Sequence, residues 1–141
     1  MNRSLLQTQI KEDLTEIEAT ICLSILDDLL YGNWNLDYIS FANLFFYAED
    51  SKEVLKILPY FTGDRTHLLD LKMYFQDGKT RYILTEDQMK SVNNGKIKHP
   101  VTNELLNYVE SLGKVFMYFA ASNLIKNLKN EILDLDKAKS D

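Results

Sequence analysis

Apolar and polar residues alternate along the stretch Leu69-Asp70-Leu71-Lys72-Met73-Tyr74-Phe75-Gln76, which leads into Asp77-Gly78. A period of two places Leu69, Leu71, Met73 and Phe75 on one face of a β-strand. Asp-Gly suits a type I′ turn, because both central residues of that turn have positive φ. The sequence therefore predicts a β-hairpin over about residues 68–84. A hairpin alone is marginally stable in water, so its apolar face must pack against helices.

Helical periodicity dominates the chain before the hairpin. Ser4 and Gln7 have the spacing of a capping box, and an apolar stripe follows up to Gly32, which predicts one helix that ends at Tyr31. A second, strongly apolar helix is expected over residues 36–48. A third is expected from Ser51, after the capping pair Asp50 and Glu53, to near Ile57, because Pro59 disfavours helical geometry at Leu58.

Two further helices are expected after the hairpin. Thr85 and Gln88 repeat the capping-box spacing, and Asn93-Asn94-Gly95 would end that short helix. Apolar residues then recur at helical spacing over residues 102–136. An unbroken helix of that length would extend roughly 50 Å, so we expect a kink at Gly113 or at Ser122-Asn123, or a C-terminal half that pairs with another chain. The fold class that follows is α+β and predominantly helical, with four to five helices, one hairpin and a long C-terminal helix.

The composition favours one compact domain over residues 1–141. The chain is 45% hydrophobic and 26% charged, and it contains five glycines and two prolines. The single cysteine, Cys22, excludes an intrachain disulfide. Acidic residues soon after Met1 argue against a signal peptide, and the apolar runs are short for a membrane span, so we expect a cytoplasmic protein without membrane contact.

The net charge of −5 is unevenly distributed. Residues 1–50 carry two bases and nine acids, a net −7, whereas residues 51–100 carry nine bases and six acids, a net +3. Residues 101–141 carry five bases and six acids, a net −1. Such a polarised domain can steer a partner electrostatically, unless folding interleaves the two sets of charges.

Signals for catalysis are weak. His67 and His99 are isolated and lack metal-ligand or triad spacing. Cys22 lies in an apolar part of its helix, where a buried and inert thiol is expected. Three pairs of adjacent acids do not face each other on a helix, so they predict solvated charge and no metal site; the pairs are Asp27 and Asp28, Glu49 and Asp50, and Glu86 and Asp87. We therefore expect no enzyme, no metal and no cofactor.

Nucleic-acid binding is not expected either. Residues 94–113 are similar to the closing part of repressor-type helix-turn-helix domains, but the hairpin and the short helix upstream leave no room for a recognition helix. A basic patch could form from Lys72, Lys79, Arg81, Lys90, Lys96 and Lys98. The chain is acidic, however, and no interleaved aromatic cluster accompanies these bases in the sequence.

Aromatic and acidic residues gather near the first turn. The predicted partner-binding residues are Asp27, Asp28, Tyr31, Trp34, Asp37 and Tyr38. Trp and Tyr are enriched at binding hot spots, and carboxylates steer a basic partner, although the same aromatic residues could instead cap the core.

The leading hypothesis is a non-enzymatic protein-binding module, a small cytoplasmic inhibitor of the immunity-protein or phage-antagonist type. Its partner would be a protein such as a basic toxin or effector. The alternative is an assembly subunit that forms a homodimer through residues 114–136. A nucleic-acid-binding regulator and a small metal- or histidine-dependent enzyme rank lower.

Overall fold

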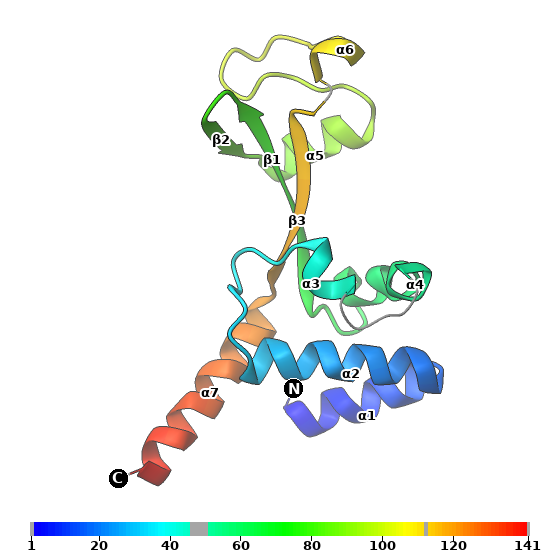
Figure 1. The fold of residues 1–141 in the computed structure, drawn as a ribbon, viewed down its shortest axis with the longest axis vertical. Helices are drawn as coiled ribbons and strands as arrows, with labels where there is room; N and C mark the ends of the chain where they lie inside the picture. Colours follow the sequence, from blue (N-terminus) through cyan, green and yellow to red (C-terminus); the bar gives the residue numbers. More distant parts are fainter. Residues whose placement is uncertain (1, 46–50, 112, 141) are drawn as a thin grey trace. The chain divides into compact units, whose positions relative to one another are not determined.

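The computed structural model describes residues 2–45, 51–111 and 113–140. Within these ranges the chain forms seven helices and a three-stranded antiparallel sheet of order β2-β1-β3 (Figure 1). The helices are α1 (Arg3–Asp13), α2 (Glu16–Tyr31), α3 (Phe41–Phe45), α4 (Ser51–Thr62), α5 (Glu86–Asn93), α6 (Tyr108–Ser111) and α7 (Asn123–Ser140). The strands are β1 (Leu69–Asp77), β2 (Thr80–Ile83) and β3 (Val115–Ala121). The predicted fold class is confirmed.

The chain divides into two compact units. Unit 1 consists of residues 1–70 and 119–141, and unit 2 consists of residues 71–118. Strands β1 and β3 each begin in one unit and end in the other. That residues 1–141 behave as a single domain stays a prediction.

The first helix of unit 1 is two helices, so the prediction of one helix up to Tyr31 is wrong in this respect. Leu14 has extended backbone angles, and the Thr15 hydroxyl accepts a hydrogen bond from the Glu18 backbone N–H to cap α2. The Glu18 carboxylate accepts in return from the Thr15 backbone N–H at 3.1 Å. Asn2, and not Ser4, caps α1. The break lets α1 fold back along α2, so that Leu6 and Ile10 are buried in the same core (Figure 1).

Two further helix boundaries differ from the prediction. Residues 36–39 do not begin a helix, because Ile39 pairs with Phe119 at the end of β3, through two backbone hydrogen bonds of 2.7 and 2.9 Å. Helix α3 begins at Phe41, and residues 46–48 of that predicted helix, like the acid pair Glu49 and Asp50, lie outside the described residues. Helix α4 continues through Pro59 to Thr62, since Phe61, one turn beyond Ile57, is also fully buried in the core.

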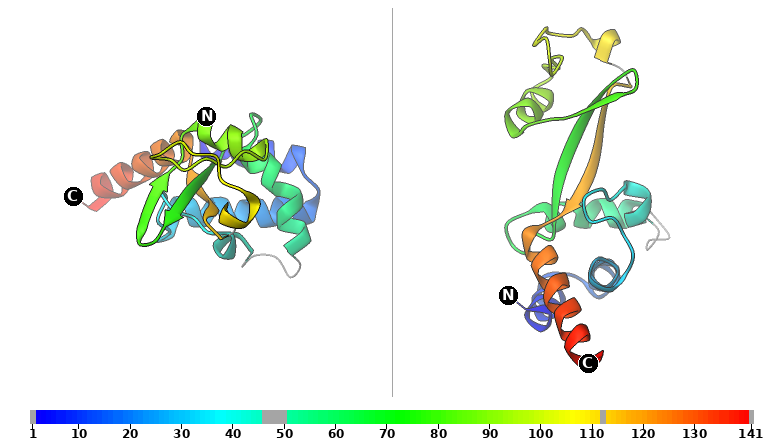
Figure 2. Two further views of the ribbon diagram at one scale, coloured as in Figure 1. Left: turned by 90° about the horizontal axis from the view of Figure 1, so that it is seen from above. Right: turned by 90° about the vertical axis from the view of Figure 1, so that its left-hand side faces the viewer.

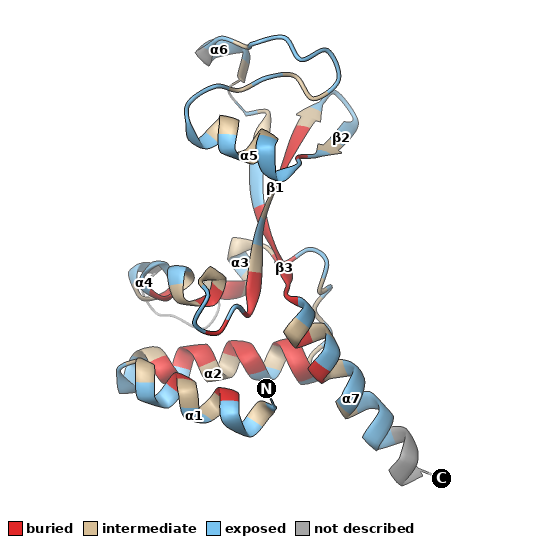
Figure 3. Ribbon diagram, turned by 180° about the vertical axis from the view of Figure 1, so that it is seen from behind, coloured by how far each residue is buried: buried red, intermediate tan, exposed pale blue. Residues whose placement is uncertain are grey.

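The core of unit 1 lies between α2 and the elements around it. Seven residues of α2 are buried, which agrees with the apolar stripe that the sequence showed up to Gly32 (Figure 3). Helices α1, α4 and α7 contribute to the same cluster, as do the ends of β1 and β3. This core fixes where α2 ends and where α7 begins.

Unit 2 contains the predicted hairpin. Strands β1 and β2 pair with Tyr74 opposite Ile83 and Gln76 opposite Arg81. Asp77 pairs with Thr80, so the turn residues are Gly78 and Lys79 and not the expected Asp77 and Gly78. Gly78 has a φ of +58°, whereas neither Asp77 nor Lys79 has a positive φ, so the expected type I′ turn does not form; a positive φ at the first central residue alone is typical of a type II′ turn. Met73, Phe75 and Leu84 form a small core on one face of the sheet, and α5 covers that face with Met89 and Val92 (Figure 2). The predicted capping box of Thr85 and Gln88 at the start of α5 is confirmed.

The region before α7 is not helical over most of its length, which corrects the prediction of a helix from residue 102. Residues 97–106 form a loop closed by a bridge between Lys98 and Leu105, and α6 is a single turn. Residues 115–121 form the strand β3, which pairs with β1 on the side opposite to β2. Gly113, at a φ of +68°, precedes that strand. Among the described residues of the predicted long helix, only the single turn α6 and helix α7 are helical, and α7 begins directly after Ser122.

Candidate functional site

The six predicted partner-binding residues lie in unit 1, at the C-terminal end of α2 and in the segment that follows. Helix α2 ends at Gly32, whose backbone N–H donates to the Asp28 carbonyl oxygen at 2.9 Å. A Cβ atom at residue 32 would lie 2.6 Å from that same oxygen. Glycine is therefore required for the chain to turn here.

Arg3 of α1 holds two of these residues. Its guanidinium forms an ion pair of 2.8 Å with Asp27, and its Cζ lies 5.1 Å from the centre of the Tyr31 ring. The hydrogen bond that Arg3 donates to the Asp27 carboxylate raises the pKa of Arg3. Asp27 is thus already neutralised, whereas Tyr31 keeps 54% of its surface exposed.

The remaining predicted residues differ in exposure. Trp34 is half-buried and packs against the core of unit 1, while Asp37 and Tyr38 are exposed. The Asn35 side chain accepts a hydrogen bond from the Asp37 backbone N–H at 3.0 Å, which shapes the turn. Lys126 of α7 then pairs with the Asp37 carboxylate at 2.9 Å.

A groove runs between this segment and α7. One hollow of about 340 Å³ is lined by Tyr31 and Trp34 on one side and by Ile132 and Leu133 on the other. A second hollow, of about 470 Å³, is lined by Leu36 and Asp37 and again by α7. Lys129 and Leu133 line both hollows, so the two lie next to each other along α7, and we call them together the α7 groove.

The structure brings three of the six predicted residues into the lining of the α7 groove, namely Tyr31, Trp34 and Asp37. Asp27, Asp28 and Tyr38 do not line it. The α7 side of the groove was not predicted as part of this site, although the apolar spacing over residues 102–136 had predicted a helix there. Lys129 links α7 to the end of α2, because its ammonium group donates to the Gly32 carbonyl oxygen at 3.0 Å.

The charge asymmetry of the sequence follows the two units. Unit 1 carries nine basic and sixteen acidic side chains, a net −7, and unit 2 carries seven basic and five acidic ones, a net +2. The α7 groove therefore belongs to the strongly acidic unit. Asp136 lies at its rim together with the exposed side chain of Leu133.

His99 is held at both ring nitrogens. Its Nε2 lies 2.9 Å from the Asp77 carboxylate, and its Nδ1 accepts from the backbone N–H groups of Val101 and Thr102 at 3.1 and 3.3 Å. A general base needs a nitrogen that can reach a substrate proton. Here both nitrogens hold the loop at residues 97–106, so the arrangement is structural.

The other side chains that were considered for catalysis or metal binding are paired, buried or far from one another. His67, which has a φ of +48°, pairs with Asp70 through Nε2. Cys22 is buried, and burial raises the pKa of its thiol to about 12, which leaves it unreactive at neutral pH. Over residues 2–45, 51–111 and 113–140, no three His, Cys, Asp or Glu side chains gather in a way that could hold a metal ion.

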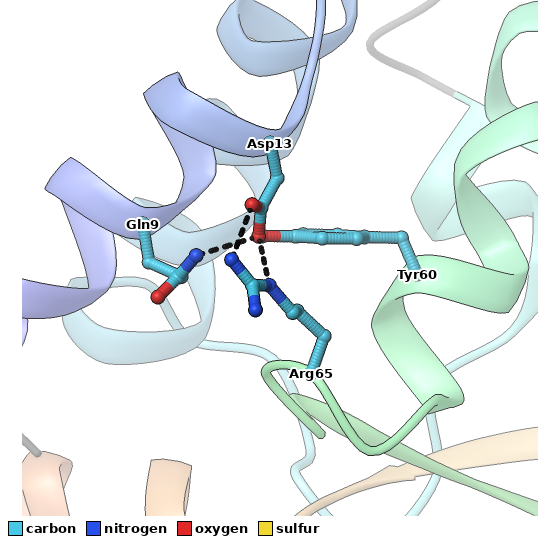
Figure 4. Close-up of polar contacts among 4 residues, drawn as sticks. All are labelled: Gln9, Asp13, Tyr60 and Arg65. Carbon is cyan, nitrogen blue, oxygen red and sulfur yellow. Dashed lines mark hydrogen bonds and ion pairs between the residues drawn. The ribbon is translucent and has the colours of Figure 1, made fainter.

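A polar cluster joins α1 to α4 and to the segment before β1 (Figure 4). The Asp13 carboxylate accepts hydrogen bonds from Gln9 at 2.9 Å, from the Tyr60 hydroxyl at 2.7 Å, and from Arg65 at 3.0 and 2.9 Å. The bonds from Arg65 and Tyr60 hold the pKa of Asp13 well below its usual value. Desolvation and the bond to Asp13 raise the pKa of Tyr60. Every partner is a fixed donor, so the cluster serves as a crosslink within unit 1.

None of the helices that the structure describes is both long enough and apolar enough to cross a membrane. Comparison with protein-family models, with curated proteins and with solved structures found no match for this chain.

Proposed function

We propose that this chain is a protein-binding module, and that the α7 groove receives a basic segment of a protein partner. The main observation behind this proposal is the set of side chains that line the groove. Tyr31 and Trp34 face Ile132 and Leu133 across it. Aromatic anchors beside aliphatic side chains provide apolar contact area. Asp37 and Asp136 line the groove beside Lys126 and Lys129, and the net charge of −7 on unit 1 as a whole would steer a basic partner.

An inhibitory role of the immunity-protein or phage-antagonist type fits this arrangement. The unit that carries the groove has a net charge of −7, which favours a basic toxin or effector as partner. The occupied nitrogens of His99 and the buried thiol of Cys22 offer no group for catalysis. Binding is the activity that we propose for unit 1.

The groove also bears on the assembly alternative. Leu133 and Leu135 are exposed at 48% and 62%, so α7 presents apolar surface beside the groove. A second copy of the chain would add another net −7 unit to this region, and like charge opposes that contact. A basic partner is therefore favoured over a homodimer.

A photo-crosslinking experiment tests the proposal. p-Benzoylphenylalanine replaces Tyr31 in one variant and Leu55 in a control variant, since Leu55 is similarly exposed on α4 at 51%. The expected result is a discrete crosslinked protein from position 31 and none from position 55, in cells of the organism that encodes the chain. Equal crosslinking from both positions contradicts the proposal.

The crosslinked partner then permits a direct measurement. Trp34 is the single tryptophan of the chain and lines the groove, so its fluorescence reports binding without a label. We expect Leu133→Ser to weaken the partner's affinity by about tenfold, and Leu55→Ser to leave it unchanged. If titrations followed by Trp34 emission gave the same affinity for both variants, the partner would not bind in the α7 groove.

A further inference from the structure

The outer face of the sheet in unit 2 carries a second cluster. Met73, Phe75 and Leu84 point to the inner face, where α5 covers them. Residues that alternate with these point outward, and they bring together Tyr74 of β1, Arg81 of β2 and Phe116 of β3.

These side chains form one stack across three strands. The Tyr74 and Phe116 rings lie 5.2 Å apart with an interplanar angle of 19°. The Arg81 guanidinium lies on the Tyr74 ring, with its Cζ 4.7 Å from the ring centre. Tyr74 is accordingly 7% exposed, whereas Phe116, on the edge strand β3, is 40% exposed.

The stack is held in place before any ligand arrives. Arg81 Nε donates to the Gln76 side-chain oxygen at 3.1 Å, and the Gln76 amide nitrogen donates to the Gly78 carbonyl oxygen at 2.7 Å. The terminal nitrogens of Arg81 make no hydrogen bond that the structure records within the described residues. They remain available to a phosphate, which a guanidinium binds through two parallel hydrogen bonds.

The charge on this face has one sign. In unit 2 the outward positions of β1 and β2 carry Lys72 and Arg81, and Lys114 lies in the turn directly before β3, where its carbonyl oxygen accepts from the Gln76 backbone N–H at 2.7 Å. Asp70, the preceding outward position of β1, belongs to unit 1. The other outward residues of unit 2 at positions 72–76, 81–83 and 116–118 are Gln76, Tyr74, Ile83, Phe116 and Tyr118. None of these is acidic. The sequence alone lacked an interleaved aromatic cluster, because Tyr74 and Phe116 are far apart along the chain and meet only through the pairing of β1 with β3.

We propose that this face of unit 2 binds single-stranded nucleic acid. Bases extend the stack at the exposed side of Phe116 and on the planar surface of Arg81, and Lys72 and Lys114 contact the phosphates. Proteins that bind single strands combine these two features, a positively charged surface and aromatic rings on which bases stack. The α7 groove lies in the other unit, so this inference does not depend on the proposed function.

Fluorescence anisotropy of the full chain with a labelled thymidine oligonucleotide of about fifteen nucleotides tests the inference. At about 50 mM salt we expect saturable binding that weakens steeply as salt is added. Phe116→Leu removes the ring but keeps an apolar side chain, and it should weaken binding about tenfold. Arg81→Lys keeps the charge but removes the planar surface, and it should weaken binding several-fold.

The matched control changes charge away from this face. Lys90 lies on α5 and Lys96 in the loop after it, so the double variant Lys90→Ala, Lys96→Ala removes as much charge as Lys72→Ala, Lys114→Ala. We expect the first double variant to bind nearly as well as wild type and the second to lose most of its affinity. Circular dichroism of each variant confirms that the sheet is retained.

Three results would overturn the inference. One is no anisotropy change with about 100 µM protein at low salt, since non-specific single-strand binding is detectable there. Another is equal loss of affinity in the two double variants. The third is displacement of the oligonucleotide by polyglutamate at equal charge concentration, which would show that the face recognises acidic protein segments without stacking.

Discussion

Asp13 receives hydrogen bonds from side chains of three different segments of unit 1. Gln9 lies one turn earlier on α1, Tyr60 lies on α4, and Arg65 precedes β1. The Asp13 side chain is 15% exposed, so a lost partner would not be fully replaced by water. The cluster therefore couples the helical hairpin of α1 and α2 to the helix that packs beside it.

The lowered pKa of Asp13 makes unit 1 sensitive to acid. A carboxyl whose pKa is depressed by folding contributes stability above its unfolded pKa of about 3.9, and loses it as the pH falls toward the folded value. We expect Asp13→Asn to lower Tm by several degrees at pH 7, because the bidentate pair with Arg65 is lost. The difference from wild type should shrink below about pH 4, because the Asp13 carboxyl of the unfolded chain then binds a proton while that of the folded protein stays ionised.

Thermal unfolding of both proteins between about pH 7 and pH 3 measures this effect. Asp64→Asn is the matched control, since Asp64 is exposed next to Arg65 and should change Tm little at any of these pH values. If the difference in Tm between Asp13→Asn and wild type stayed constant down to pH 3, folding would not lower the pKa of Asp13.

Among the helices and strands, the sequence predicted correctly those that depend on residues close together in the chain. The hairpin over residues 69–83 and the capping box at Thr85 and Gln88 depend on residues a few positions apart, and both were found. Strand β3 was missed because Phe116 and Phe119 also fit a helical stripe. Its strand geometry depends on β1, some forty residues earlier, which supplies the hydrogen-bond partners.

The candidate site shows the same division. Tyr31, Trp34 and Asp37 lie close in sequence, and they were predicted together. Leu133 and Lys129 form the opposite wall only because α7 packs against the end of α2. The outer stack of unit 2 requires three strands to be in register, which the alternation within one strand cannot reveal.

The break between α1 and α2 was also locally encoded, by Thr15 and Glu18. Removing the hydroxyl in Thr15→Ala should destabilise the protein by about 1 kcal/mol, the usual cost of an N-cap. Thr20→Ala on the same helix is the control, because the Thr20 hydroxyl only donates to the carbonyl oxygen of Glu16 one turn before it. Urea unfolding followed by circular dichroism measures both, and equal losses would mean that the cap does not stabilise the start of α2.

For the whole molecule, the two units have unequal cores. Twenty described side chains form the buried cluster of unit 1, whereas three form that of unit 2. None of the residues of α5 is fully buried, while seven residues of α2 are. Regions with few buried apolar side chains open at lower free energy than the core, so unit 2 should open first.

Hydrogen exchange followed by mass spectrometry tests this order of opening. After correction for intrinsic rates, amides of β2 and α5 should exchange at least about tenfold faster than those in the centre of α2. Leu84→Ala, in the core of unit 2, should speed exchange in α5 and leave α2 protected, since β1 and β3 still enter unit 1 with Leu69 and Phe119 buried there. Leu29→Ala removes a fully buried side chain of unit 1 and should lower protection in α2 by the equivalent of about 2–5 kcal/mol. Equal protection of α2 and α5, with both substitutions acting on both helices, would instead indicate that residues 1–141 open as one cooperative domain.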